Sequence, residues 1–155
     1  MSHIHELIDY TVEVFIVHNN AVLIRLHDKY NIWTCPWGHI ELDEDPNQWA
    51  IREAKEETWL DIILYDWHQK FKGHVWNQKE LVPPIFMNIH QIWETKHHHV
   101  WLVYFWYSES KEVNPLAQDD ISNDRKWMTV DDLNSSKDIS EHVKVYWIEA
   151  IKTYN

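Results

Sequence analysis

Residues 38–60 read GHIELDEDPNQWAIREAKEETWL, and the spacing of the polar residues in this stretch guides the interpretation of the whole chain. Gly38 is followed after five residues by Glu44, and seven more residues lead to the run Arg-Glu-Ala-Lys-Glu-Glu at 52–57. If each identity occurs at about 1 in 15, six identities at fixed spacing arise by chance on the order of once in 10⁷ starts. The pattern is therefore highly specific.

A helix is expected to begin at Asp45 and Pro46. Asp45 is a favourable N-cap, proline suits the first helical position, and Gln48 completes a capping box. The helix should run to about Thr58. With 100° between successive residues, its acids gather on one face and a small apolar face lies opposite. The acidic face holds Trp49, Arg52, Glu53, Glu56 and Glu57, and the apolar face holds Ala50, Ile51, Ala54 and Thr58.

Carboxylates three and four residues apart repel by a few tenths of a kcal/mol per pair on an exposed helix. A magnesium or manganese ion removes this repulsion, because hard cations take several oxygen ligands and a phosphate supplies the rest. A solvated charged face is the ordinary explanation of a bare EAKEE run. The matching offsets of Gly38, Glu44 and Arg52 favour a metal site instead.

This spacing resembles the Nudix box, the loop–helix–loop signature of hydrolases that cleave a nucleoside diphosphate linked to another group. The resemblance implies an α/β fold, an α/β/α sandwich with a mixed β-sheet, the box helix and a C-terminal helix. We expect one such domain over residues 1–155. The implied reaction is attack of a metal-activated water on a phosphorus of the diphosphate. Only residues 36–60 carry the resemblance with high specificity.

The resemblance also assigns roles to individual residues. The implied ligands of Mg²⁺ or Mn²⁺ are Glu53, Glu56, Glu57 and the backbone carbonyl of Trp37. The implied catalytic residues are Glu44, Arg52, Glu53 and Glu57. Arg52 would orient Glu53 by a charge-assisted hydrogen bond, and Glu44 would hold the loops or contact a metal-bound water. The general base stays open between a box glutamate and a later acid, such as Glu109, Glu112, Asp119 or Asp120.

Three tryptophans depart from the family pattern. Trp37 and Trp59 stand where the family has glycine, and Trp49 stands where a small residue is common. The residue after a helix often takes the left-handed conformation, in which a bulky residue costs about 1–2 kcal/mol. The indole of Trp37 could fill the cleft through which phosphate approaches, or the indoles could pack over the helix or face solvent.

The whole chain contains two glycines and 11 tryptophans. One hypothesis is that the tryptophans replace small residues of an ordinary Nudix sequence, as in an engineered variant. Reverting Trp37 and Trp59 to glycine should then raise stability or activity. The alternative to an active enzyme is a catalytically impaired Nudix-fold module that binds a nucleotide or a protein.

Composition limits the partners. The net charge of −11 opposes binding to long nucleic acids and favours a cation between the protein and any phosphate substrate. The single cysteine, Cys35, excludes an internal disulfide and suits a reducing compartment. The chain has no apolar run that would span a bilayer and does not begin like a signal peptide. We expect a cytoplasmic protein with a small nucleotide or related diphosphate as substrate, no membrane partner, and a homodimer as an open alternative.

The remaining segments predict strands around the box helix and a second helix near the end. Strands are expected at 10–17, 21–26, 33–35, 85–93, 100–107 and 126–130, with another around Ile40 and Leu42. Asn19 and Asn20 should form the turn of a hairpin. Asp138 and Glu141 form a second capping-box pattern. The helix behind it places apolar residues at core spacing, namely Val143, Tyr146, Trp147, Ala150, Ile151 and Tyr154.

Histidines 97–99 raise a second metal hypothesis. His97 and His99 would share one side of a strand and could bind zinc with His90 or His74. The ordinary explanation is a polar strand start, or histidines that contact substrate or water.

Substrate specificity is expected in the loops at 28–33, 72–84 and 108–124. Aromatic residues in such loops could stack a base, and Tyr30 and Trp33 are the substrate-binding candidates.

Overall fold

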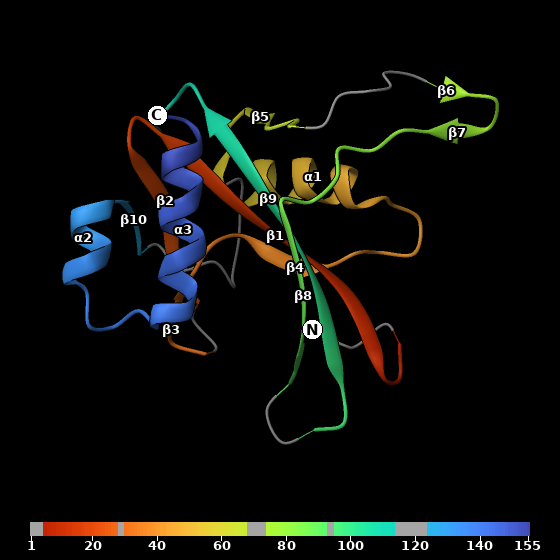
Figure 1. Cartoon of the computed structure of the whole chain (residues 1–155), viewed down its shortest axis with the longest axis horizontal. Coiled ribbons are helices and arrows are strands. Elements are labelled where there is room, and N and C mark those ends of the chain that lie inside the picture. Colours follow the sequence, from red (N-terminus) through yellow and green to blue (C-terminus); the bar gives the residue numbers. More distant parts are fainter. Residues whose placement is uncertain (1–4, 28–29, 68–73, 93–94, 114–123) are drawn as a thin grey trace.

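The computed structural model describes residues 5–27, 30–67, 74–92, 95–113 and 124–155. In the described part, a mixed eight-stranded sheet has helix α1 on one side and helix α3 on the other (Figure 1). The elements are β1 (Ile8–His18), β2 (Ala21–His27), β3 (Ile32–Thr34), β4 (Trp37–His39), α1 (Pro46–Thr58), β5 (Ile62–Leu64), β6 (His74–Val75), β7 (Gln78–Lys79), β8 (Phe86–Gln91), β9 (His98–Ser108), β10 (Arg125–Thr129), α2 (Val130–Ser135) and α3 (Glu141–Thr153).

Strands β1 and β9 form the centre of the sheet. They pair in parallel from Ile8 with His98 to Val17 with Tyr107, and the other pairs in the described sheet are antiparallel. The main path runs β10-β2-β1-β9-β5, with β3 on β2, β4 on β1 and β8 on β9. Because β9 has neighbours on both sides and helices over both faces, its apolar sequence is that of a central strand, as predicted.

Alternating residues of β1 and β9 divide the core into two halves. Phe15 and Phe105 pack with Trp147 of α3, whereas Val14 and Tyr104 pack on the face that α1 covers. The six residues predicted as the inner stripe of α3 all belong to the first half or pack against it. The predicted α/β/α sandwich is therefore confirmed.

Local signals at the turn between β1 and β2 and at the start of the box helix were predicted correctly. Asn19 and Asn20 have positive φ angles of 40° and 66°, as expected for the tight turn between β1 and β2. The Asp45 carboxylate accepts hydrogen bonds from the N–H groups of Asn47 and Gln48, and the Gln48 side chain accepts from the Asp45 N–H. This reciprocal cap explains why α1 begins at Pro46.

One predicted strand and one predicted helix cap were wrong. Residues 40–42 do not form a strand, because β4 ends at His39 and the chain then turns, with the Glu44 N–H bonding the Glu41 carbonyl. The N-cap of α3 is Ser140, without a side-chain hydrogen bond, rather than Asp138. Ile139 is buried in the core on the α3 side, and the N-cap lies two residues after Asp138.

Helix α2 was not predicted, although its sequence carried a signal. The Thr129 side chain accepts from the Asp132 N–H, and the Asp132 carboxylate accepts from the Thr129 N–H. This is the same reciprocal cap as that of α1. None of the described helices is long and apolar enough to cross a membrane.

Candidate active site

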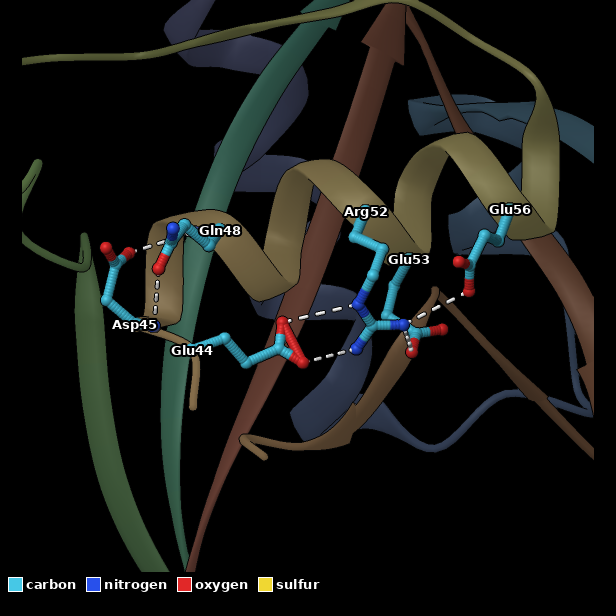
Figure 2. A network of polar contacts seen from close by, with 6 residues as sticks. All are labelled: Glu44, Asp45, Gln48, Arg52, Glu53 and Glu56. Carbon is cyan, nitrogen blue, oxygen red and sulfur yellow. Dashed lines mark hydrogen bonds and ion pairs between the residues drawn. The ribbon is translucent and has the colours of Figure 1, made fainter. Parts of the chain in front are cut away.

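Arg52 gathers the acids of the box around one guanidinium group (Figure 2). It contacts both oxygens of Glu44, with Nη2 2.6 Å from Oε1 and Nε 3.3 Å from Oε2. Its Nη1 lies 2.6 Å from Glu53 Oε1 and 3.1 Å from Glu56 Oε2. The hydrogen bond to Glu44, more than any other contact, raises the pKa of Arg52. The structure thus brings together four of the residues predicted for the site.

Glu57 lies apart from this network, on the buried side of α1. Its Oε1 accepts a hydrogen bond of 2.8 Å from Arg25 Nη2, and both side chains are at most 10% exposed. Its Oε2 is buried and has no hydrogen-bond partner among the described residues. Burial raises the pKa of Glu57 to about 7, although the charge of Arg25 opposes this. The simple helical wheel missed this burial, and it also placed Ile51 inside although that side chain is 54% exposed.

The donor atoms of the glutamates are of the type that a hard divalent cation prefers. A buried carboxylate oxygen without a partner is costly, and a cation bound to it removes that cost. Burial raises the pKa of Glu53, and a cation would counter this effect as well. Glu53, Glu56 and Glu57 offer only oxygen donors, the type that Mg²⁺ and Mn²⁺ take.

The three arginines of the chain all lie beside box glutamates. Arg25 of β2 and Arg125 of β10 are directly paired across the two strands. In the described structure, Arg25 Nε and Arg125 Nε and Nη2 are buried without hydrogen-bond partners. Burial lowers the pKa of Arg125, and the Arg25 charge adds to this effect. Two guanidinium groups with free N–H donors beside Glu57 could bind an anionic substrate.

Sequence analysis missed Arg25 and Arg125. The available signal was the scarcity of arginine, since only three of the 14 basic residues are arginines and one of them, Arg52, already lay in the box. Their pairing depends on the register of β2 and β10, which residue spacing did not reveal.

Trp37 points away from the box helix. A Cβ on the next residue, Gly38, would face Trp49 of α1, so the neighbouring side chain in the strand points to the opposite face of the sheet. There the Trp37 ring lies 6.1–6.5 Å from the rings of His27, His39 and His99. Of the alternatives left open for the Trp37 indole, packing over the box helix is therefore wrong.

Trp49 is a core residue, fully enclosed between α1 and the sheet. It is 1% exposed and packs with Val14 and Ala54. A Cβ added at Gly38 would lie 2.7 Å from its Cζ2 atom. The large indole and the missing side chain are therefore complementary, so Trp49 fills space that Gly38 provides.

Trp59 occupies the left-handed position expected after the box helix. Its φ is 61° and its N–H bonds the Lys55 carbonyl, which closes the end of α1. The ring is 45% exposed, and Lys55 Nζ lies 4.5 Å from its centroid. The prediction that a bulky residue stands where glycine is favoured is confirmed.

The predicted substrate contacts Tyr30 and Trp33 each have a close neighbour. The Tyr30 ring is tilted against the His27 ring at 4.7 Å between centroids, and Lys126 Nζ lies 3.9 Å from the ring centroid of Trp33. Glu109 and Glu112 are exposed, and Asp119 and Asp120 lie outside the described residues.

A second group of polar side chains lies on the face to which Trp37 points. Asp9, His39 and His99 each offer one ligand atom, and these atoms lie within 4.8 Å of one another. Burial, followed by the neighbouring histidines, lowers the pKa of His99 to about 4. His97 and His99 do share a side, as predicted, and His90 lies beside His99 at 5.8 Å between ring centroids. The side chain of His74 is not described, and Asp9 and His39 were missed.

Comparisons with known proteins agree with this fold and site. A sequence model of the NUDIX domain matches residues 9–147. A crystal structure of a hydrolase of the NUDIX family from Clostridium perfringens is 31% identical, covers 95% of this chain and 98% of its own, and superposes with a TM-score of 0.82. No curated protein matches the chain.

Two more distant structures show the fold alone. An ADP-ribose pyrophosphatase from Streptococcus suis is 12% identical over 95% of this chain and 92% of its own, with a TM-score of 0.57. An Ap4A hydrolase from C. elegans is 16% identical over 96% of this chain and 98% of its own, with a TM-score of 0.55. The fold and box define a Nudix-type pyrophosphohydrolase. The chain belongs to the Nudix family.

Proposed function

We propose that this protein hydrolyses a diphosphate bond in a nucleoside diphosphate linked to another moiety, using Mg²⁺ or Mn²⁺. The observation that carries the proposal is the buried Glu57 oxygen without a hydrogen-bond partner, between the acids around Arg52 and the paired arginines of β2 and β10. Such a site offers oxygen ligands to a cation on one side and N–H donors to an anion on the other.

Each part of the site has a task in this proposal. Glu53, Glu56 and Glu57 hold the metal, together with the carbonyl of Trp37. The bound metal supplies the activation of water and the neutralisation of charge on the phosphates. Arg52 keeps Glu53 in place through its 2.6 Å hydrogen bond, and Glu44 braces Arg52 in turn.

Arg25 and Arg125 orient the diphosphate in the same proposal. Their buried N–H groups match phosphate oxygens, and an arginine fork binds two such oxygens at once. Tyr30 and Trp33 are the candidates for contacts to the nucleoside. The substrates in the names of the structural neighbours, ADP-ribose and Ap4A, are compounds of the class to test first.

The cytoplasm remains the proposed location. Cys35 is buried and free, which suits a reducing compartment.

The test is the release of phosphate or nucleoside monophosphate from a panel of nucleotides, with and without Mg²⁺ or Mn²⁺. Glu53→Gln and Glu57→Gln should lower kcat by at least about 10²-fold, because each removes a charged metal ligand. Glu149→Gln, an exposed glutamate of α3, is the matched control and should leave kcat unchanged. Release without metal, or equal rates in all three variants, would contradict the proposal.

Arg25→Lys tests the proposed anion contact. Lysine keeps a positive charge beside Glu57 but loses the fork, so KM for the substrate should rise by a larger factor than the metal concentration needed for half-maximal rate. Unchanged KM together with unchanged stability would remove Arg25 from the substrate site.

A further inference from the structure

Three adjoining strands bring together a carboxylate and two imidazoles. Asp9 of β1 pairs directly with His99 of β9, and His39 of β4 lies opposite Thr11 of β1. The side chains of Asp9 and His39 are 1% and 8% exposed, and His99 is 4% exposed. Three ionisable side chains thus meet in the protein interior, away from solvent.

The two distances that His39 makes match those between ligands around a small cation, and all three donor atoms lie within 4.8 Å of one another. His39 Nε2 lies 3.2 Å from His99 Nε2 and 3.3 Å from Asp9 Oδ2. Donors at about 2.0–2.1 Å from a tetrahedral zinc ion are about 3.3–3.4 Å apart. The observed edges differ from this geometry by about 0.2 Å or less.

His97 adds a fourth nitrogen beside the group. Its Nδ1 lies 3.2 Å from the carbonyl oxygen of Glu6, which can only accept, so Nδ1 carries the proton. Its Nε2 then faces Asp9 Oδ2 at 3.3 Å.

The carboxylate is also held in place. Asp9 Oδ1 accepts a hydrogen bond of 2.6 Å from the backbone N–H of His5, which leaves Oδ2 directed at His39 and His97.

We propose that Asp9, His39 and His99 bind one divalent cation of the zinc class, with His97 beside Asp9 at the edge of the site. The site is distinct from the box, because His39 lies on the face of β4 opposite the side of Gly38 that faces α1. Imidazole nitrogens select zinc and its transition-metal neighbours over Mg²⁺, which prefers oxygen. The ion would link β1, β4 and β9. It would lie in the part of the sheet in which β8, β9 and the start of β1 extend beyond α3 (Figure 1).

The test is a calorimetric titration of the metal-free full chain with Zn²⁺ in the presence of millimolar Mg²⁺, which saturates the proposed box site. We expect one Zn²⁺ per chain, and binding at least about tenfold weaker in His39→Gln and in His99→Gln. His98→Gln is the matched control, since this neighbour on β9 points to the other face, and it should bind as wild type does. Glu57→Gln should also bind Zn²⁺ unchanged, which separates this site from the proposed catalytic one.

Several outcomes would overturn the proposal. They are no Zn²⁺ binding in excess Mg²⁺, equal loss in His98→Gln and His99→Gln, or loss in Glu57→Gln. Absence of Zn²⁺ binding would show that the cluster is stabilised by protons and not by a metal ion. Should the histidine variants fail to fold, Co²⁺ replaces Zn²⁺ in the wild-type chain. The intense visible absorption of four-coordinate cobalt then supports the site, and the weak spectrum of six-coordinate cobalt overturns it.

Discussion

Gly38→Ala should destabilise the protein by steric overlap with Trp49. The added Cβ would lie 2.7 Å from Trp49 Cζ2, whereas ordinary contacts begin at 3.4 Å. The φ angle of Gly38 is outside the left-handed range, so alanine introduces no backbone strain there. Because Trp49 is enclosed, the overlap must move either the strand or α1.

The expected cost is about 1–3 kcal/mol, the usual range for one extra methyl in a packed core. For a chain of this size, that lowers the melting temperature by about 2–12 °C. Urea unfolding followed by tryptophan fluorescence and by far-UV circular dichroism measures the change without any need for activity.

A double-mutant cycle identifies the cause. Trp49→Phe removes the ring atom that the new methyl would meet, so Gly38→Ala should cost less than about 0.5 kcal/mol in that background. An equal cost in both backgrounds would refute the steric explanation, and so would a cost below about 0.5 kcal/mol in the wild type.

Three further predictions concern stability. Trp59→Gly should raise the free energy of unfolding by about 0.5–1 kcal/mol. The change removes the strain of a bulky residue in the left-handed conformation, about 1–2 kcal/mol, and loses the favourable contact between Lys55 and the ring, about 0.5–1 kcal/mol. A lower free energy of unfolding than wild type in urea would contradict this. Burial raises the folded-state pKa of Glu13 to about 8, against 4.5 for the ordinary group, so its charge destabilises the fold increasingly between these pH values. Glu13→Gln should therefore stabilise the protein by a few kcal/mol above pH 8 and by nothing below about pH 4.5, and a gain of equal size in melts at both pH values would rule this out. Asp45→Ala should lower the free energy of unfolding by about 1 kcal/mol, because the helix cap is lost. Asp45→Asn keeps the cap and loses only the ion pair to Lys79. Equal destabilisation by the two variants in thermal melts would show that the cap is not the cause.

The box helix could be predicted because its signals are local. Asp45, Pro46 and Gln48 act within one turn, and the carboxylates that follow keep a helical spacing that any reader of the sequence can count. The family resemblance then supplied the α/β/α sandwich with its mixed sheet. Local signals failed where burial displaced them, as at Ile139, which moved the start of α3.

The contacts that sequence analysis missed depend on strand register. Asp9 and His39 meet His99 only because β1 pairs with β4 on one side and with β9 on the other. Arg125 meets Arg25 through the pairing of β10 with β2 in the same way. No periodic pattern links such residues, since the distances between them along the chain are set by loops and helices.

Trp37 and Trp49 show a related limit. Their positions in the family pattern suggested a blocked cleft, but one points away from α1 and the other fills the space over Gly38. The direction of a side chain from a strand could be predicted only after the strand itself had been placed correctly.

The parallel pairing of β1 with β9 also sets an order of events during folding. β1 can pair early with β2, its neighbour in sequence, but its other edge waits for a strand that begins at His98. Closing so long a loop costs entropy before any contact repays it, which makes such topologies slow to fold. During synthesis, one edge of β1 stays open until residues 98–108 leave the ribosome, and an open apolar edge invites aggregation. Changes that weaken the β1–β9 pairing should therefore lower the yield of folded protein more than they lower its stability at equilibrium.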